Sequence, residues 1–255
     1  MPGAADGPPH RSDAVTRDSP PAPPPTGPGG QQVRMPPRGR REEILDGASE
    51  MFAQHGYHGS SLRDISARIG ISHSGMLHHF ESKDVLLDGV IDRMEDHAQS
   101  ALEGIDEFRG SREDLLRGLA EVWHPASLPI RLLATLDAET VSEDHPGRFR
   151  VARLRKVHEH MLETCFEGLA ERGPRREETD PAFAGRALLA MVLNLAVREK
   201  TVRPYQRPSR DDAPLADLAR QVDALLGAEV APDGHQDPQA APEDAGSDDE
   251  ACRAT

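Results

Sequence analysis

The chain has 255 residues and a formal net charge of −14 at pH 7. No apolar run approaches about 18 residues, and the amino end lacks the apolar core of a signal peptide, so the sequence predicts a cytoplasmic protein without a membrane span. Only two cysteines are present, Cys165 and Cys252. Two such distant cysteines exclude a disulfide framework, and we interpret both as free thiols.

The two ends of the chain differ in composition from its middle. Residues 1–37 contain eleven of the 22 prolines and few large apolar residues, so they cannot bury enough surface to offset the entropy of ordering. Residues 228–255 contain eight acidic residues and one arginine, which supply seven of the fourteen net negative charges. We predict that both segments are disordered. Because the sequence before Met35 is of low complexity, Met35 is an alternative start.

The folded part therefore spans residues 38–227, and its first predicted helix covers residues 39–55. Apolar side chains recur there every three to four residues and form one face of the helix, which ends at Gly56. They are Ile44, Leu45, Ala48, Met51 and Phe52.

Two short helices joined by a tight turn follow between residues 60 and 79. Ser61, with Asp64 three residues later, fits a capping box for the first of them, whose buried face would carry Leu62, Ile65 and Ile69. Gly70 supplies the positive φ angle of the turn, and Ser72 caps the second helix. This helix-turn-helix arrangement is how a protein inserts one helix into the major groove of DNA.

The order of these residues resembles the tetracycline-repressor-like (TetR-like) family of bacterial transcription regulators. The resemblance covers about fifty residues from Arg41, REEILDGASEMFAQHGYHGSSLRDISARIGISHSGMLHHFESKDVLLDGVI. It implies an all-α fold with a three-helix, helix-turn-helix DNA-binding domain at residues 38–82. A helical-bundle domain for ligand binding and dimerisation would follow at residues 83–227.

The start of the second short helix is the predicted reading surface for DNA bases. Ser72, His73 and Ser74 would face base edges, and Gly75 would allow a close approach of the backbone. A neutral His73 can both donate and accept hydrogen bonds. A basic region around this helix would track the phosphates, although a solvated basic face is the alternative. Its members are Arg34, Arg38, Arg40, Arg41, Arg63, Arg68 and Lys83.

The resemblance adds roles for individual residues. It implies that Lys83 contacts a phosphate, that the hydroxyl of Ser60 or Ser61 does so at the start of its helix, and that Phe80 closes the small core. The family carries a phosphate-binding tyrosine where this chain has Leu77, so His78 or a backbone amide would replace that contact. His55, His58, His73, His78 and His79 lack the spacing of zinc ligands, and we expect no metal and no cofactor.

The remaining sequence is helical in pattern and contains no strand-like alternation. The helix at 180–200 is apolar on two faces: Ala187, Met191 and Asn194 lie on one, and Ala184, Leu188, Val192 and Leu195 on the other. Together with a seam of Leu215, Leu218, Val222 and Leu225 in the last helix, this pattern predicts a homodimer through residues 180–200 and 213–227. Ordinary core helices of a monomer are the alternative. We predict helices at 83–108, 111–123, 127–142, 147–172, 180–200 and 213–227.

An effector pocket is expected where polar or aromatic groups interrupt apolar helix faces. His158 and Asn194 would either bond within the protein or contact a ligand. The predicted lining comprises Trp123, His158, Met161, Cys165, Met191 and Asn194.

The sequence thus predicts a dimeric repressor that a small-molecule effector releases from a palindromic, double-stranded operator. A constitutive or nucleoid-type DNA-binding protein and an activator are the alternatives. No nucleophile with a base, no paired carboxylates and no metal-ligand set are apparent in the sequence, so we predict that the protein is not an enzyme.

Overall fold

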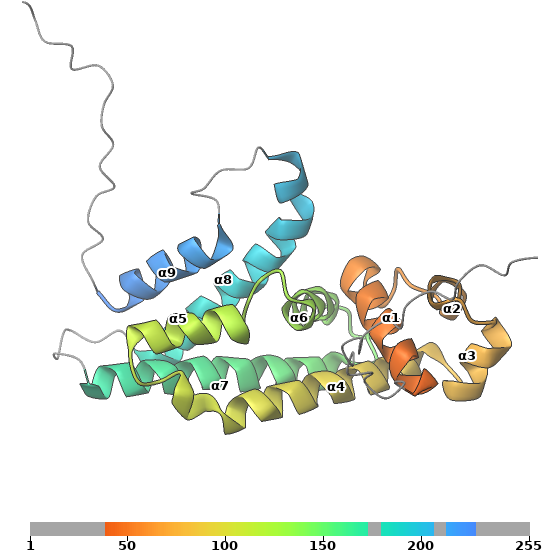
Figure 1. Ribbon diagram of the computed structural model, residues 1–255, viewed down its shortest axis with the longest axis horizontal. Coiled ribbons are helices and arrows are strands. Elements are labelled where there is room, and N and C mark those ends of the chain that lie inside the picture. Colours follow the sequence, from red (N-terminus) through yellow and green to blue (C-terminus); the bar gives the residue numbers. More distant parts are fainter. Residues whose placement is uncertain (1–38, 173–179, 207–212, 228–255) are drawn as a thin grey trace, which may run out of the picture. The chain divides into compact units, whose positions relative to one another are not determined.

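The structure is a computed structural model that describes residues 39–172, 180–206 and 213–227. The predicted disordered segments, Met35, Arg38 and Cys252 lie outside these residues. In the described ranges, all regular secondary structure is helical, with nine α-helices and two short 3-10 turns (Figure 1). The predicted all-α fold is confirmed.

The first three helices form a small head around one core. They are α1 (Arg40–His55), α2 (Leu62–Ile69) and α3 (His73–His79). Phe80 is 1% exposed, as predicted for a core aromatic, and the guanidinium carbon of Arg41 lies 4.9 Å from its ring centroid. The side chains that meet in this core include Ile44, Leu45, Phe52, Ile65, Met76 and Phe80.

The predicted helix caps of the head are present. The Ser61 hydroxyl oxygen accepts a hydrogen bond of 3.2 Å from the backbone N–H of Asp64, and Ser72 accepts one of 3.0 Å from Gly75. Gly70 has a φ angle of 78°, in the left-handed region that favours glycine. Each cap satisfies a helix-terminal N–H that has no partner within the helix.

The helical body follows directly after the head. In Figure 1, α7 and α8 pack along one another, α4 runs beside α7, and α9 lies against α5. Arg112 of α5 donates a hydrogen bond of 2.7 Å to Asp223 of α9. The elements are α4 (Lys83–Glu103), η1 (Ile105–Glu107), α5 (Arg112–Glu121), α6 (Leu128–Glu139), α7 (Arg148–Arg172), α8 (Pro181–Thr201), η2 (Arg203–Tyr205) and α9 (Pro214–Leu225).

The predicted helix at 83–108 is shorter than expected. It ends at Glu103, and the 3-10 turn that follows leads into Phe108. Phe108 is 6% exposed, and its ring centroid lies 6.4 Å from that of Trp123 in a T-shaped arrangement. The helix has Gly104 as its C-cap, and the turn after it carries the Phe108 ring into the core.

Helix α8 is more apolar than the search for unbroken apolar runs predicted. Among the described residues, it is the one helix that is long and apolar enough to cross a membrane by length and composition. The sequence reasoning counted unbroken apolar runs, whereas mean hydropathy tolerates isolated polar residues such as Arg186 and Asn194. Because Ala184, Leu188 and Val192 are fully buried inside the bundle, packing against α7 accounts for much of this apolar character.

Candidate nucleic-acid interface and its connection to the helical body

The start of α3 presents short polar side chains outward. Ser72 and Ser74 are exposed, and their hydroxyl oxygens lie 3.1 Å apart. His73 is half-buried, and its Nδ1 has no hydrogen-bond partner among the described residues. Gly75, one turn into the helix, is half-buried. The structure therefore brings together Ser72, His73 and Ser74, which the sequence predicted to face bases, and Gly75, which it predicted to allow close approach of the backbone.

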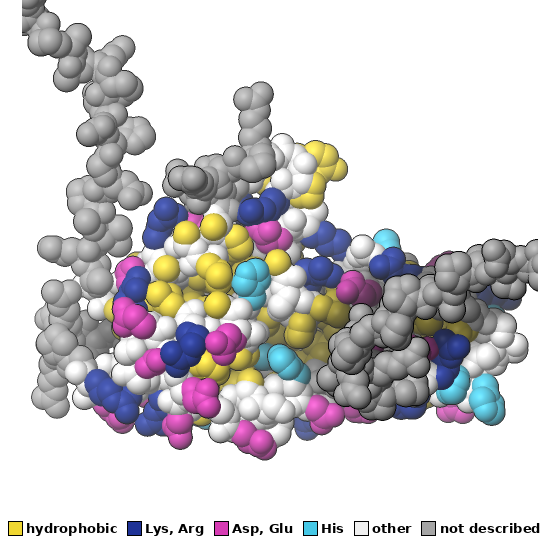
Figure 2. Space-filling model, in the orientation of Figure 1, with side chains coloured by type: hydrophobic (Ala, Val, Ile, Leu, Met, Phe, Trp, Pro, Cys, Tyr) yellow, Lys and Arg dark blue, Asp and Glu magenta, His cyan; other side chains and the backbone are white. Residues whose placement is uncertain are grey.

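The outer face of α3 also carries exposed residues. His78 and His79 are exposed, and Leu77 is 41% exposed where the family has a tyrosine. Figure 2 shows histidine side chains gathered at the end of the molecule that carries α3. Because Leu77 has no polar atom in its side chain, it leaves His78 as the exposed hydrogen-bonding group nearest to it on this helix.

Basic residues around α3 differ in whether they form an ion pair within the described residues. Arg63 and Arg68 are exposed on α2. Arg40 is also exposed, but its Nη1 lies 2.6 Å from the Glu43 carboxylate. Arg63 and Arg68 are thus placed to reach a phosphate directly, whereas Arg40 would first have to leave its ion pair.

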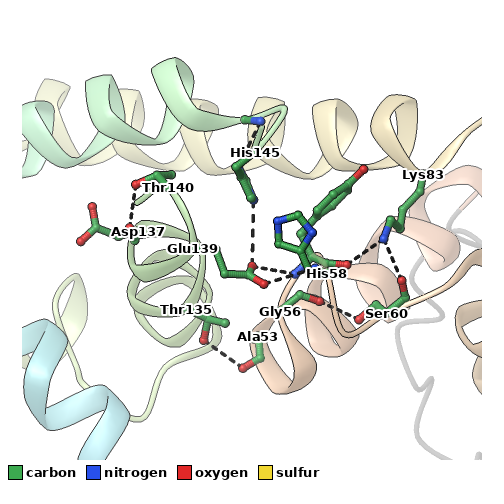
Figure 3. Close-up of polar contacts among 12 residues, drawn as sticks. Ala53, Gly56, His58, Ser60, Lys83, Thr135, Asp137, Glu139, Thr140 and His145 are labelled. Atoms are coloured by element: carbon green, nitrogen blue, oxygen red, sulfur yellow. Dashed lines mark hydrogen bonds and ion pairs between the residues drawn. The ribbon is translucent and has the colours of Figure 1, made fainter. Parts of the chain in front are cut away.

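Lys83, predicted to contact a phosphate, is tied to the head in Figure 3. Its Nζ donates hydrogen bonds to the carbonyl oxygens of Tyr57, at 2.9 Å, and Ser60, at 3.0 Å. The same ammonium lies 4.0 Å from the centroid of the Tyr57 ring. An ammonium has three N–H donors, so one remains for a phosphate. Lys83 therefore holds the α1–α2 loop, and its contact with a phosphate stays a prediction.

Of the two candidate hydroxyls, Ser60 and Ser61, the structure turns that of Ser60 away from the surface. This residue is 4% exposed, and its hydroxyl donates a hydrogen bond of 2.8 Å to the carbonyl of Gly56. The hydroxyl turns inward because carbonyls at the end of α1 need donors. Ser61, one residue later, is exposed and caps α2, so it retains the predicted role of a hydroxyl at the helix start.

The carboxyl end of α1 is held by side chains from the body. Thr135 of α6 donates a hydrogen bond of 3.2 Å to the carbonyl of Ala53, and Nζ of Lys200 in α8 donates one of 3.1 Å to the same oxygen. Lys200 also donates to the carbonyl of Gln54. The body therefore supplies donors that a helix cannot supply to its own last carbonyls.

Glu139, the last residue of α6, is hydrogen-bonded to the loop after α1 (Figure 3). Its carboxylate accepts hydrogen bonds from the backbone N–H groups of Tyr57, at 2.7 Å, and His58, at 3.2 Å. Gly56 has a φ angle of 74°, and a Cβ there would lie 2.3 Å from a carboxylate oxygen of Glu139. Only glycine fits this position without a shift. No periodic sequence signal marks a contact between residues so far apart in the chain, and sequence reasoning missed it.

His145 lies behind this contact. It is 3% exposed, its Nδ1 accepts a hydrogen bond of 3.2 Å from the N–H of Gly147, and its Nε2 lies 4.0 Å from the Glu139 carboxylate. Burial lowers the pKa of His145, and the negative charge of Glu139 opposes that shift. Because Nδ1 accepts, the ring carries its proton on Nε2, facing Glu139.

Four of the six predicted effector residues, Trp123 just after α5 and three residues of α7, lie in the packed core. Nε1 of Trp123, just after α5, donates a hydrogen bond of 3.2 Å to Nδ1 of His158. Burial, with a smaller contribution from His97, lowers the pKa of His158 to about 4, so the ring is neutral. Met161 and Cys165 are completely buried beside them in the core. The alternative that His158 is a hydrogen-bonded core residue therefore fits the structure.

The two predicted effector residues of α8 lie elsewhere. Met191 is half-buried, and Asn194 is exposed. The expectation that Asn194 is a buried polar group is wrong, because the face it shares with Ala187 points out of the bundle. In the part of the chain that the structure describes, no three His, Cys, Asp or Glu side chains are grouped so as to hold a metal ion.

Residues 44–90 match the model of a family described as bacterial regulatory proteins, tetR family. The chain is 45% identical over 47 residues to the HTH-type transcriptional repressor AcnR of Corynebacterium diphtheriae, covering 18% of this chain and 25% of that protein. It is 35% identical over 85 residues to AcnR of Corynebacterium efficiens, covering 33% and 43% respectively. The matches thus span less than half the length of these curated relatives.

The fold also resembles solved structures over most of its length. One is the transcriptional regulator FadR of Bacillus subtilis in complex with stearoyl-CoA, with a TM-score of 0.55 and 16% identity. That alignment covers 74% of this chain and 99% of FadR. At this identity, the likeness concerns the fold.

Proposed function

The chain carries a helix-turn-helix domain of the tetR family of bacterial regulatory proteins, and we propose that it is a dimeric repressor that leaves its operator when a small effector binds. The observation that carries this proposal is the family match across α1 to α4, on a head whose α3 exposes its polar first turn. The named relatives are transcriptional repressors. We place the protein in the cytoplasm with its DNA.

In this proposal, α3 enters the major groove and reads bases with Ser72, His73 and Ser74. Short hydroxyl side chains can donate to or accept from base edges, and histidine can do either. Arg63, Arg68 and the remaining donor of Lys83 would contact phosphates. Phosphate contacts set the position of the head on DNA, whereas the α3 contacts supply the choice of sequence.

The outer face of α8 supports a homodimer. Phe183 is 54% exposed and Val197 is 45% exposed, and the small residues Ala187 and Ala190 lie between them on the same stripe with Asn194. This spacing alternates between four and three residues, as in the seam of two packed helices. Alanines allow close approach of a partner helix. We propose that a second copy covers this stripe, so that two α3 helices reach successive major grooves.

Helix α9 enters this proposal differently from the sequence expectation. Leu218 and Val222 are fully buried and Leu225 is 8% exposed, so most of its apolar seam already packs inside its own chain. Its part in the dimer would use the remaining surface, beside α8.

Regulation requires that the effector favour a body conformation in which the two heads no longer match the operator. The hold of Thr135, Glu139 and Lys200 on the end of α1 supports such coupling, since a shift of α6 or α8 must move these contacts. The stearoyl-CoA complex of FadR, which has a similar fold, supports a ligand-responsive body. A coupling free energy of about 1–3 kcal/mol would weaken operator binding roughly 5- to 150-fold.

Fluorescence anisotropy with promoter fragments, compared with scrambled DNA of equal length at one salt concentration, tests this function. A repressor of this kind binds one palindromic fragment at least about a thousandfold more tightly than scrambled DNA. Equal affinities with a steep salt dependence would instead identify a nucleoid-type protein. Transcription in vitro from the retained fragment then separates repression from activation.

A further inference from the structure

A groove of about 350 Å³ lies where α1, α6 and α8 meet. Its walls include the small apolar side chains of Ala134, Ala138 and Ala196. The charged side chains that line it are Arg131, Lys200 and Glu139, and the Glu139 carboxylate already accepts two backbone N–H groups. A second hollow of about 230 Å³ shares Arg131 and Lys200 with it. None of the predicted effector residues lines this groove, which adjoins the end of α1.

Two cations converge on this groove. Lys200 has no carboxylate within 4.0 Å among the described residues, and its ammonium is bound only to backbone carbonyls. Arg131 and Lys200 line the same two hollows, so their positive charges lie near each other. Burial and, secondarily, the charge of Arg131 lower the pKa of Lys200. Arg131 has one carboxylate partner, Glu50, at 3.4 Å, and both side chains are partly exposed. Such a partly exposed ion pair contributes little to stability, so Arg131 can exchange it for a ligand at small cost.

We propose that this groove binds a small molecule with one carboxylate and a short apolar chain. The carboxylate lies between Arg131 and Lys200, and the chain lies along Ala134, Ala138 and Ala196. Arg131 has five N–H donors and Lys200 has three, so each retains at least one for the ligand. Hydrogen bonds between ionised partners are the strong ones, and the apolar wall adds burial.

Binding there acts on the head through Lys200. The carboxylate takes the remaining N–H of the ammonium that caps the carbonyls of Ala53 and Gln54. The attraction between the two charges draws this ammonium toward the ligand, so a bound anion loosens the hold of α8 on α1. This regulatory consequence rests on the proposed function, but the binding itself does not.

Isothermal titration of the full chain with sodium hexanoate, and with hexan-1-ol as an uncharged match, tests the site. Hexanoate should bind at least about tenfold more tightly than hexanol, since one charge-assisted contact is worth that much. Lys200→Gln and Arg131→Gln should each lower the affinity for hexanoate by about this factor. Lys156→Gln, on an exposed part of α7, is the matched control and should change nothing.

Glu50→Gln should change the hexanoate affinity in the opposite direction. It removes the carboxylate that competes for Arg131, so hexanoate should bind more tightly than to the unmodified chain. This variant and Arg131→Gln decide the question if Lys200→Gln fails to fold. Absent hexanoate binding, equal binding of hexanol, or unchanged binding by Arg131→Gln would overturn the site. Operator preference measured in parallel separates this outcome from failure of the proposed function.

Discussion

The carboxylate of Glu139 accepts a hydrogen bond of 2.7 Å from the backbone N–H of Tyr57, 82 residues earlier in the chain. The same carboxylate receives the N–H of His58. The carboxylate at the end of α6 therefore serves as the acceptor for two N–H groups in the loop after α1. In the proposed function, this contact would connect the body to the head in addition to α4.

Replacing Glu139 by alanine should lower the free energy of unfolding by about 1–3 kcal/mol, because two backbone N–H groups, of which that of Tyr57 is partly buried, lose their acceptor. Glu139→Gln keeps one acceptor oxygen and should cost less. Urea unfolding followed by circular dichroism measures both changes. Glu143→Ala, in the exposed loop after α6, is the control and should stay within about 0.5 kcal/mol. If Glu139→Ala matches that control, the contact does not stabilise the fold.

His158 should make stability depend on pH. Its folded pKa of about 4 lies below the ordinary value of 6.5, so the unfolded chain binds more protons between these values. The free energy of unfolding therefore falls as pH falls from 6.5 to 4, by about 3 kcal/mol at most from this residue. His158→Gln keeps an acceptor for Trp123 and should flatten this dependence in urea titrations. His160→Gln, an exposed neighbour, should leave the slope unchanged.

Local sequence signals predicted the head well. Ser61, Gly70 and Ser72 have the predicted cap and turn roles because each depends on neighbours within three residues. Asn194 was expected to be buried because periodicity shows which residues share a helix face but not whether that face packs inside the chain. The inward hydroxyl of Ser60 depends on its bond to the Gly56 carbonyl, which the cap pattern does not encode. The bonds of Lys200 and Glu139 to the end of α1 join distant segments, and periodicity carries no information about such pairs.

Arg63 and His73 should affect DNA binding in different ways. Arg63→Gln removes an exposed positive charge, so affinity should fall by a similar factor on all DNA sequences, and the salt dependence should decrease by about one unit. His73→Ala should relax discrimination at one or two base positions and leave the salt slope nearly unchanged. Anisotropy on operator and scrambled DNA at several salt concentrations measures both. Parallel losses for the two variants would contradict this division of roles.

Cys165 should be unreactive in the folded protein. Burial raises the pKa of its thiol to about 12, and its side chain is completely buried. At pH 8 only roughly one molecule in ten thousand would carry the reactive thiolate. In a Cys252→Ser variant, mass spectrometry should therefore find no iodoacetamide adduct until urea unfolds the chain. Stoichiometric labelling of the folded protein would show that this part of the core opens readily.

The exposed stripe of α8 allows a direct test of the homodimer. Ala190 lies in the middle of the stripe, between Phe183 and Val197, so Ala190→Arg places a long charged side chain where a partner helix must approach closely. Sedimentation equilibrium should show a monomer for this variant, and its operator affinity should fall steeply because two heads no longer bind together. Ala152→Arg makes the same change on an exposed position of α7 and should remain dimeric. A dimer that survives Ala190→Arg must use another surface, and the stripe would then need a different explanation.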